Sequence, residues 1–202
     1  PGLASCRRRP LSSNVRPHIQ LPCRAMLPNP MTQIRRKVSI GGLSKPELLE
    51  RLASAGVEIN SIGLQLFAQE SFGTLELPIV VESVQTTVAE LGLPHGGVFA
   101  QVISAAEERD LALCPLELGP HLRLALLDQA EGAHGFESTQ HTAPPGAITV
   151  ISQPLPEDGG EFRGFYLRRI EGTLWLRGYK SWSGHLWQPE DILLFTSARN
   201  AA

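Results

Sequence analysis

Two strand-like runs on either side of Glu171-Gly172 constrain the fold of this chain more than any other feature. Residues 164–170 and 173–179 are rich in aromatic and branched side chains, and only two residues separate them. This spacing is typical of a β-hairpin with a two-residue turn, in which glycine readily takes the positive φ that the turn needs. The register would then pair Ile170 with Thr173, Arg168 with Trp175 and Tyr166 with Arg177.

Side chains alternate between the two faces of a hairpin, so the register also predicts what each face carries. The core face would hold Phe165, Leu167, Leu174 and Leu176. The other face would hold Tyr166, Arg168, Trp175, Arg177 and Tyr179. Guanidinium groups among aromatic rings form cation–π pairs worth about 0.5–2 kcal/mol, and such a face suits a planar anion such as a carboxylate, a phosphate or a base.

A second interpretation of the aromatic face is structural. The two N-terminal helices could cover it, with the arginines paired locally. Trp182, His185 and Trp187 follow on the next turn, and aromatic residues also line the rims of protein interfaces. The face could therefore bind a small ligand, bind a partner protein, or be buried.

The remaining periodicity predicts an α+β fold, with N-terminal helices and one middle helix packed on a mainly antiparallel sheet, and a strand-rich C-terminal half. A capping box at Ser44 and Glu47 starts the first helix, which Gly56 ends. Further helices are expected over 60–69 and 98–109, and a long loop over 129–146. Strands are expected over 75–84, 121–127, 147–152 and 192–196, besides the hairpin.

Charge divides the chain into two unlike parts. Residues 1–46 hold nine basic residues and no acidic one, whereas 47–202 hold nine basic and twenty acidic residues, which leaves −11. Six prolines fall within the first thirty residues, which favours neither helix nor strand. We expect 1–37 to be a basic leader with the native start at Met31, 38–198 to be one domain, and 199–202 to be a tail. A transit peptide and a nucleic-acid-binding arm are the alternatives for the leader.

The segment from Leu111 to Gln129 concentrates reactive side chains. Cys114, Glu117 and His121 could serve a small hydrolase or transferase if the imidazole lay beside the thiol, and Asp191 is a second candidate base. The competing interpretation is a buried thiol before a proline turn. A metal site built from Cys114, His121, His134 and His141 is not expected, because their spacing is irregular and neither CxxC nor HExxH occurs.

The sequence predicts no cofactor and no membrane span. No glycine-rich segment has the lysine and hydroxyl of a phosphate-binding loop. No apolar run reaches eighteen residues. Cys6 and Cys23 lie in the leader, so Cys114 is alone in the body, which favours a reducing, cytoplasmic compartment.

From Leu43 onward, a series of phrases resembles a family of uncharacterised bacterial proteins, some of which carry the label "helicase". The phrases are GLPHG, CPLELGPHLRL, DQAEG, APPGAITV, GFYLRRIEGTLWLRGY and HLWQPED. The label implies an accessory role with nucleic acid, because the chain has neither the nucleotide-binding loop nor the length of a motor protein. The acidic body makes contact with phosphate backbones unfavourable.

Taken together, the sequence favours a non-catalytic binding module for a small anionic ligand or a partner protein, through Tyr166, Arg168, Trp175, Arg177 and Tyr179. An enzyme using Cys114, Glu117 and His121, and a nucleic-acid accessory protein, are the alternatives.

Overall fold

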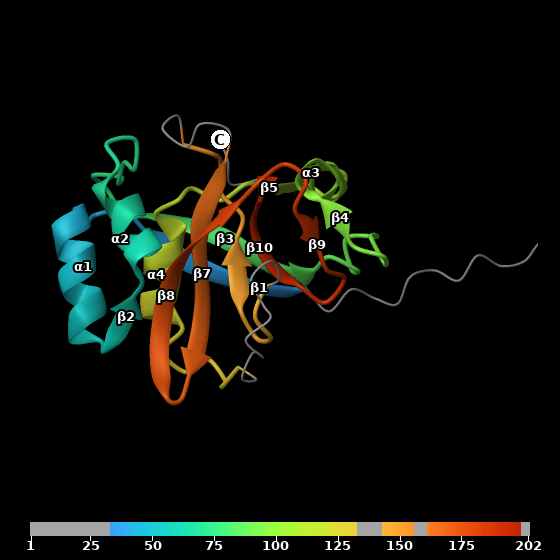
Figure 1. Ribbon diagram of the computed structural model, residues 1–202. Coiled ribbons are helices and arrows are strands. Elements are labelled where there is room, and N and C mark those ends of the chain that lie inside the picture. Colours follow the sequence, from blue (N-terminus) through green and yellow to red (C-terminus); the bar gives the residue numbers. More distant parts are fainter. Residues whose placement is uncertain (1–32, 133–142, 156–160, 199–202) are drawn as a thin grey trace, which may run out of the picture. The chain divides into compact units, whose positions relative to one another are not determined.

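The fold is described from a computed structural model, which covers residues 33–132, 143–155 and 161–198. The expected α+β class is confirmed, with four helices and a large, curled, mostly antiparallel mixed sheet in the described ranges (Figure 1). The helices are α1 (Lys45–Ser54), α2 (Ser61–Ala68), α3 (Phe99–Glu107) and α4 (Leu118–Ala125). The strands are β1 (Ile34–Ile40), β2 (Val57–Ile59), β3 (Ile79–Thr87), β4 (Gly97–Val98), β5 (Leu111–Ala112), β6 (Ile148–Val150), β7 (Phe162–Ile170), β8 (Thr173–Ser181), β9 (Leu186–Trp187) and β10 (Ile192–Ser197).

One main sheet organises the described chain. Its strand order is β1-β3-β10-β6-β7-β8-β2, with β5 paired to β10, and a small second sheet joins β4 to β9. The β6–β10 and β2–β8 pairs are parallel, and the other pairs are antiparallel. No helix in the described ranges is long and apolar enough to cross a membrane.

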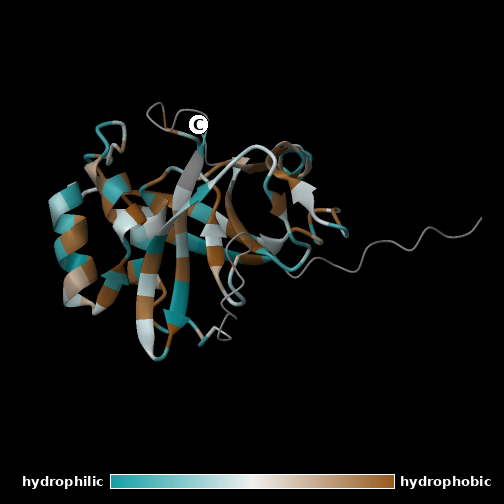
Figure 2. Ribbon diagram, in the orientation of Figure 1, coloured by the Kyte–Doolittle hydropathy of each residue, from teal (hydrophilic) through white to brown (hydrophobic). Residues whose placement is uncertain are grey.

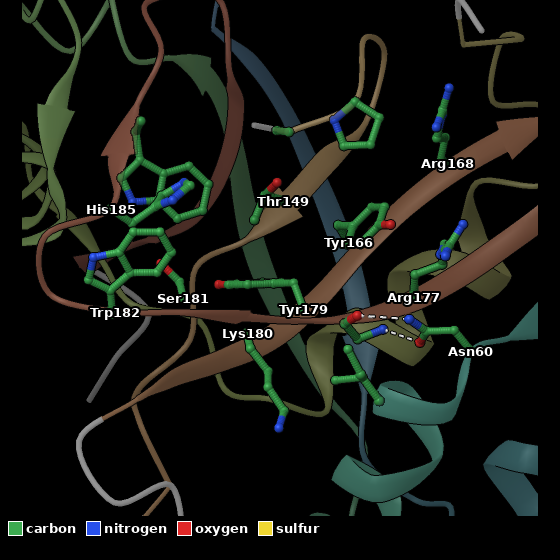
Figure 3. Close-up of a pocket in the computed structure, with 15 residues that line it drawn as sticks. Asn60, Thr149, Tyr166, Arg168, Arg177, Tyr179, Lys180, Ser181, Trp182 and His185 are labelled. Atoms are coloured by element: carbon green, nitrogen blue, oxygen red, sulfur yellow. Dashed lines mark hydrogen bonds between the residues drawn. The ribbon is translucent and has the colours of Figure 1, made fainter. Parts of the chain in front are cut away.

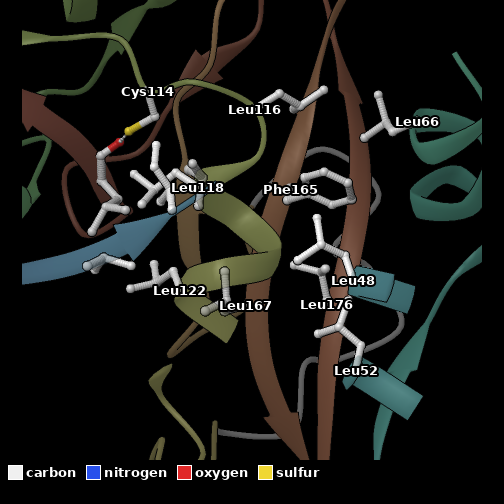
Figure 4. Packing of buried hydrophobic residues seen from close by; sticks show 14 of the residues in the cluster. Leu48, Leu52, Leu66, Cys114, Leu116, Leu118, Leu122, Phe165, Leu167 and Leu176 are labelled. Atoms are coloured by element: carbon white, nitrogen blue, oxygen red, sulfur yellow. Dashed lines mark hydrogen bonds between the residues drawn. The ribbon is translucent and has the colours of Figure 1, made fainter. Parts of the chain in front are cut away.

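Each face of the main sheet has its own core. On one face, α1, α2 and α4 pack against β7 and β8 through side chains that include Leu48, Leu66, Leu122, Phe165 and Leu176 (Figure 4). On the other face, α3 and β9 pack on β3 and β10. The central strand β10 serves both cores, because Leu194 points into the first and Leu193 and Phe195 into the second.

The α1 helix shows how the sequence sets this packing. Leu48 and Leu52, one turn apart, are fully buried, and Figure 2 shows hydrophobic and hydrophilic bands alternating along the helix. The expected capping interaction is present, because the backbone N–H of Ser44 donates to Glu47 Oε2 at 2.8 Å. The Ser44 hydroxyl also donates to that oxygen, at 2.7 Å.

The predicted hairpin is confirmed in turn and register. Glu171 and Gly172 both have positive φ, 50° and 78°, as a type I′ turn requires. Ile170 pairs with Thr173, Arg168 with Trp175 and Tyr166 with Arg177. The face assignment is also confirmed, since Phe165, Leu167 and Leu176 are fully buried in the first core and Leu174 packs at its edge.

The structure corrects two predicted elements. Residues 121–127 are not a strand, because α4 occupies Leu118–Ala125. Leu118 and Leu122, four residues apart, both enter the core, and Pro120 lies in the first turn, where a missing N–H costs little. The β3 strand begins at Ile79 rather than near Leu75, just after Pro78.

Two edge strands were not predicted. The β1 strand begins at Ile34, so residues 34–37, which composition placed in the leader, belong to the sheet, where they pair with β3. The β2 strand runs parallel to β8 at the other edge.

Candidate functional site

A cavity of about 410 Å³ lies against the hairpin face opposite to the first core. Strands β6, β7 and β8, the turn from β8 to β9, and the start of α2 contribute its walls. Figure 3 shows two groups of side chains facing each other across it. We call the group with Tyr166, Arg168 and Arg177 the arginine end, and the group with Trp182, His185 and Trp187 the aromatic end.

The arginine end is built by cross-strand pairing. Thr149 of β6 pairs with Tyr166 of β7, which pairs with Arg177 of β8, so the three side chains form a row on one face of the sheet. The Arg177 guanidinium lies 5.9 Å from the centre of the Tyr166 ring and 5.2 Å from that of Trp175. The predicted cation–π pairs are therefore present, and they hold this guanidinium in place.

Arg177 is a cation with unused donors. Within the residues that the structure describes, it takes part in no ion pair, and its buried Nε has no hydrogen-bond partner. An arginine carries five N–H donors in a planar fork that matches carboxylate or phosphate oxygens. The site thus offers a positioned anion-binding group without a partner from the described protein.

The aromatic end is a chain of edge-to-face rings. Tyr179 meets Trp187 at 6.1 Å between ring centres, Trp187 meets His185 at 4.7 Å, and His185 meets Trp182 at 5.4 Å, with interplanar angles of 75–89°. Such pairs are worth about 0.5–1.5 kcal/mol beyond area burial. His185 and Trp187 are buried, whereas Trp182 is 48% exposed.

Tyr179 lies between the two ends, and a glycine makes room for it. It pairs with Gly164 across the hairpin. A Cβ at Gly164 would come within 3.0 Å of the phenol ring. The Tyr179 hydroxyl donates to Val150 O at 3.4 Å, and burial raises the pKa of this phenol. The neutral phenol thus forms part of the cavity wall at any ordinary pH.

The free edge of β8 is closed by one amide side chain. Asn60, the N-cap of α2, donates from Nδ2 to Gly178 O at 3.0 Å and accepts from Gly178 N at 2.7 Å. It therefore continues the strand pairing that β2 begins. The approach is close, because a Cβ at Gly178 would lie 2.4 Å from Gly63 N.

The cavity is electropositive within an acidic body. Arg168, Arg177 and Lys180 line it, and no Asp or Glu is among its described lining residues. These are three of the nine basic residues that follow position 46, where twenty acidic residues occur. Burial raises the pKa of Tyr166, and the nearby positive charges of Arg177 and Arg168 oppose that rise.

Aromatic residue types are sorted between site and core. The chain has two Tyr and three Trp. Tyr166, Tyr179, Trp182 and Trp187 line the cavity, and Trp175 stacks on Arg177. None of the described Phe residues lines it. Rings with a polar handle suit a surface that is apolar but wet.

The structure therefore brings together four of the five residues that the sequence singled out as ligand-binding, with Trp175 directly behind them. The interpretation in which both N-terminal helices cover this face is wrong, since α1 and the body of α2 pack in the opposite core, and of the two helices only the start of α2, through Asn60 and Ile62, reaches the described cavity wall. Sequence analysis missed Asn60, Thr149, Lys180 and Ser181. Thr149 is the only polar residue between Ala147 and Ile151, a signal that was available.

The alternative catalytic set is not assembled in this way. Cys114 is buried, its Sγ donates to Leu194 O at 3.3 Å, and burial raises the pKa of the thiol (Figure 4). His121 Nε2 accepts from Gly41 N at 3.1 Å, and Glu117 Oε2 accepts from Leu75 N at 3.2 Å. Each of the three side chains engages a different segment, and those of Glu117 and His121 hold the loops that flank α1 and α2.

A second hollow, of about 640 Å³, borders Cys114 but contains no charged lining residue and no histidine. It offers no group that could take the proton of the thiol. Asp191, the other candidate base, accepts from Gln188 N at 2.8 Å, and burial raises its pKa to about 6. It closes the turn before β10 and does not line the cavity at the hairpin.

No group of three or more metal-ligating side chains occurs in the described ranges. His134 and His141, two of the four residues considered for a metal, lie outside them.

Comparisons with models of protein families, with curated proteins and with solved structures found no match to this chain.

Proposed function

We propose that this protein is a binding module for a small ligand that carries a carboxylate or a phosphate, and that the cavity beside the hairpin is its site. The observation that carries the proposal is Arg177, a guanidinium held between two rings at the wall of the cavity, with no anionic partner in the described chain. A volume of about 410 Å³ is within the range of small-molecule sites, about 300–1,000 Å³.

Electrostatics supports an anion in particular. A protein surface rich in carboxylates repels anions in general. A cavity whose described charged lining residues are all cations therefore attracts anions to one place. Arg177 is partly buried, and in such surroundings a bidentate guanidinium–carboxylate pair is stronger than at an open surface. A catalytic function through Cys114 has less support, because the thiol lacks a nearby base.

The proposal is tested by thermal stabilisation with acetate, benzoate and inorganic phosphate, each compared with sodium chloride at equal ionic strength. We expect at least one of these anions to raise the melting temperature of the wild-type protein, since a ligand that binds only the folded state stabilises it. Arg177→Met, which keeps an unbranched side chain but removes the guanidinium, should remove that rise.

Lys37→Met is the matched control, because it removes one positive charge from an exposed position on β1. It should respond to anions like the wild type. Equal responses of Arg177→Met and the wild type, or no response to any of the three anions, would refute the proposal.

A further inference from the structure

The arginine end accounts for only part of the cavity. An anion held at Arg177 would leave most of about 410 Å³ to be filled, since a water molecule occupies only about 30 Å³ in the liquid. Four of the other described lining residues carry aromatic rings, namely Tyr179, Trp182, His185 and Trp187. A ligand that fills the site must therefore carry something that suits rings.

We infer that the ligand is an elongated aromatic or heteroaromatic acid, in which a linker joins a planar ring to a carboxylate or a phosphate. Its anionic group would be held by Arg177, and its ring would pack against Trp182 and the edge-to-face rings behind it. This inference rests on the proposed function, and it adds the class of ligand.

Trp182 is the residue that fits this role best. It is 48% exposed, whereas His185 and Trp187 behind it are buried. Its indole packs across the turn over Gly184, where a Cβ would come within 3.1 Å of Nε1. The turn is closed by His185 N donating to Trp182 O at 2.9 Å. A large apolar side chain is thus held half-exposed at the cavity by its own turn, which leaves ring surface for a ligand to cover.

The polar atoms at this end favour a ring over an aliphatic chain. Ser181 Oγ and Trp187 Nε1 are buried without a hydrogen-bond partner in the described chain, and His185 is a further polar group nearby. An aliphatic tail would bury such groups at a cost. The edge of an aromatic ring carries partial positive charge and its face partial negative charge, so it can make favourable contacts with both hydroxyls and other rings.

Figure 3 shows the order of the side chains along the cavity. Trp182, Ser181 and His185 lie on one side of the view and Arg168 and Arg177 on the other, with Thr149, Tyr166 and Tyr179 between them. The middle residues are a threonine and two tyrosines, none of which carries charge at neutral pH. Arg177 and Trp182 are five residues apart along β8 and the turn that follows it, which is about 16 Å of extended chain, so a ligand that contacts both must be elongated.

The test compares two acids of the same charge and similar size. 6-Phenylhexanoate has a planar aromatic ring on a linker long enough to reach from Arg177 to Trp182, and 6-cyclohexylhexanoate has a puckered saturated ring on the same linker. Calorimetric titration of the full chain should show 6-phenylhexanoate binding about tenfold more tightly, as expected for one ring-stacking interaction. Calorimetry is preferred because the variant below removes one of the three tryptophans.

Trp182→Leu should abolish the preference for 6-phenylhexanoate while keeping the weaker, charge-dependent affinity for both acids. Trp182→Tyr, which restores a ring, should recover most of the preference. The exposure of Trp182 makes both variants compatible with the fold, and the comparison of the two acids on the wild type does not depend on any variant.

The outcomes separate the two proposals. If both acids bind equally to the wild type and Arg177→Met loses both, the site binds anions but the inference about the ring is wrong. If neither acid binds, the proposed function fails and the inference fails with it. A preference that survives Trp182→Leu would also overturn the inference, because the ring would then be recognised elsewhere.

Discussion

Gly178→Ala tests the packing that positions the site. A Cβ at Gly178 would lie 2.4 Å from Gly63 N and 2.6 Å from the Ile62 carbonyl carbon. Both atoms belong to the backbone of α2, so no side-chain rotation can relieve the overlap. The helix and β8 would have to separate.

The size of the effect follows from two contributions. Overpacking of this kind costs about 1–3 kcal/mol. Separation also lengthens the two hydrogen bonds between Asn60 and Gly178, each worth about 1 kcal/mol. We therefore expect a loss of about 3–5 kcal/mol, or roughly 10 °C in melting temperature for a unit of this size.

Thermal denaturation followed by circular dichroism measures the change. Gly73→Ala is the matched control, since nothing lies within 4 Å of its added Cβ and its φ is not positive. Asn60→Ala removes the hydrogen bonds without adding bulk, and its cost should not add fully to that of Gly178→Ala, because the two residues share these bonds. If Gly178→Ala melts within about 2 °C of Gly73→Ala, the close approach of α2 and β8 is wrong.

Three further predictions concern the buried titratable groups. Burial raises the pKa of Asp191 from 3.8 to about 6, so its ionisation opposes folding, and wild-type stability should fall between about pH 4 and 6. Asp191→Asn should remove this pH dependence, and its free energy of unfolding at pH 7, measured by urea denaturation, should exceed that of the wild type by about 3 kcal/mol. A wild-type protein that unfolds at the same urea concentration at pH 4 and pH 7 would contradict this. Burial lowers the pKa of His121, so the contribution of this side chain to stability is complete above pH 6.5 and is lost as the pH falls. His121→Phe should lower the free energy of unfolding by about 1–3 kcal/mol at pH 7, because the buried Gly41 N–H loses its acceptor. A variant as stable as the wild type would argue against this contact. Alkylation of Cys114, followed by peptide mass spectrometry, should be at least about a hundredfold slower in the native chain than in urea, and a fast native reaction would revive the thiol as a nucleophile.

The hairpin shows what local sequence can determine. Its register depends only on the two-residue turn, and its faces depend only on alternation, so both followed from residues 164–179. All five proposed ligand-binding residues came from this stretch, and four of them line one cavity.

Other elements depended on information that is not local. In β1 the alternating burial of Val38 and Ile40 was hidden behind three consecutive cations that resemble the leader. In α4 the prolines suggested that no helix could form, although the first turn of a helix tolerates a proline such as Pro120. Asn60 joins the cavity through hydrogen bonds to Gly178, which is far away in sequence, so only the folded sheet could identify it. Thr149 stands out in sequence as a polar residue in an apolar strand, but its pairing with Tyr166 is known only from the sheet.

Chemical shifts of the tryptophan indoles test the central claim most directly. The chain has three tryptophans, and hence three indole N–H signals in a nitrogen–proton correlation spectrum. On titration with 6-phenylhexanoate, we expect the signals of Trp175, which stacks on Arg177, and of Trp182 to move, and the backbone amides of β1 and α3 to stay in place. Unmoved indole signals alongside shifts in β1 or α3 would place the anion elsewhere and contradict the account.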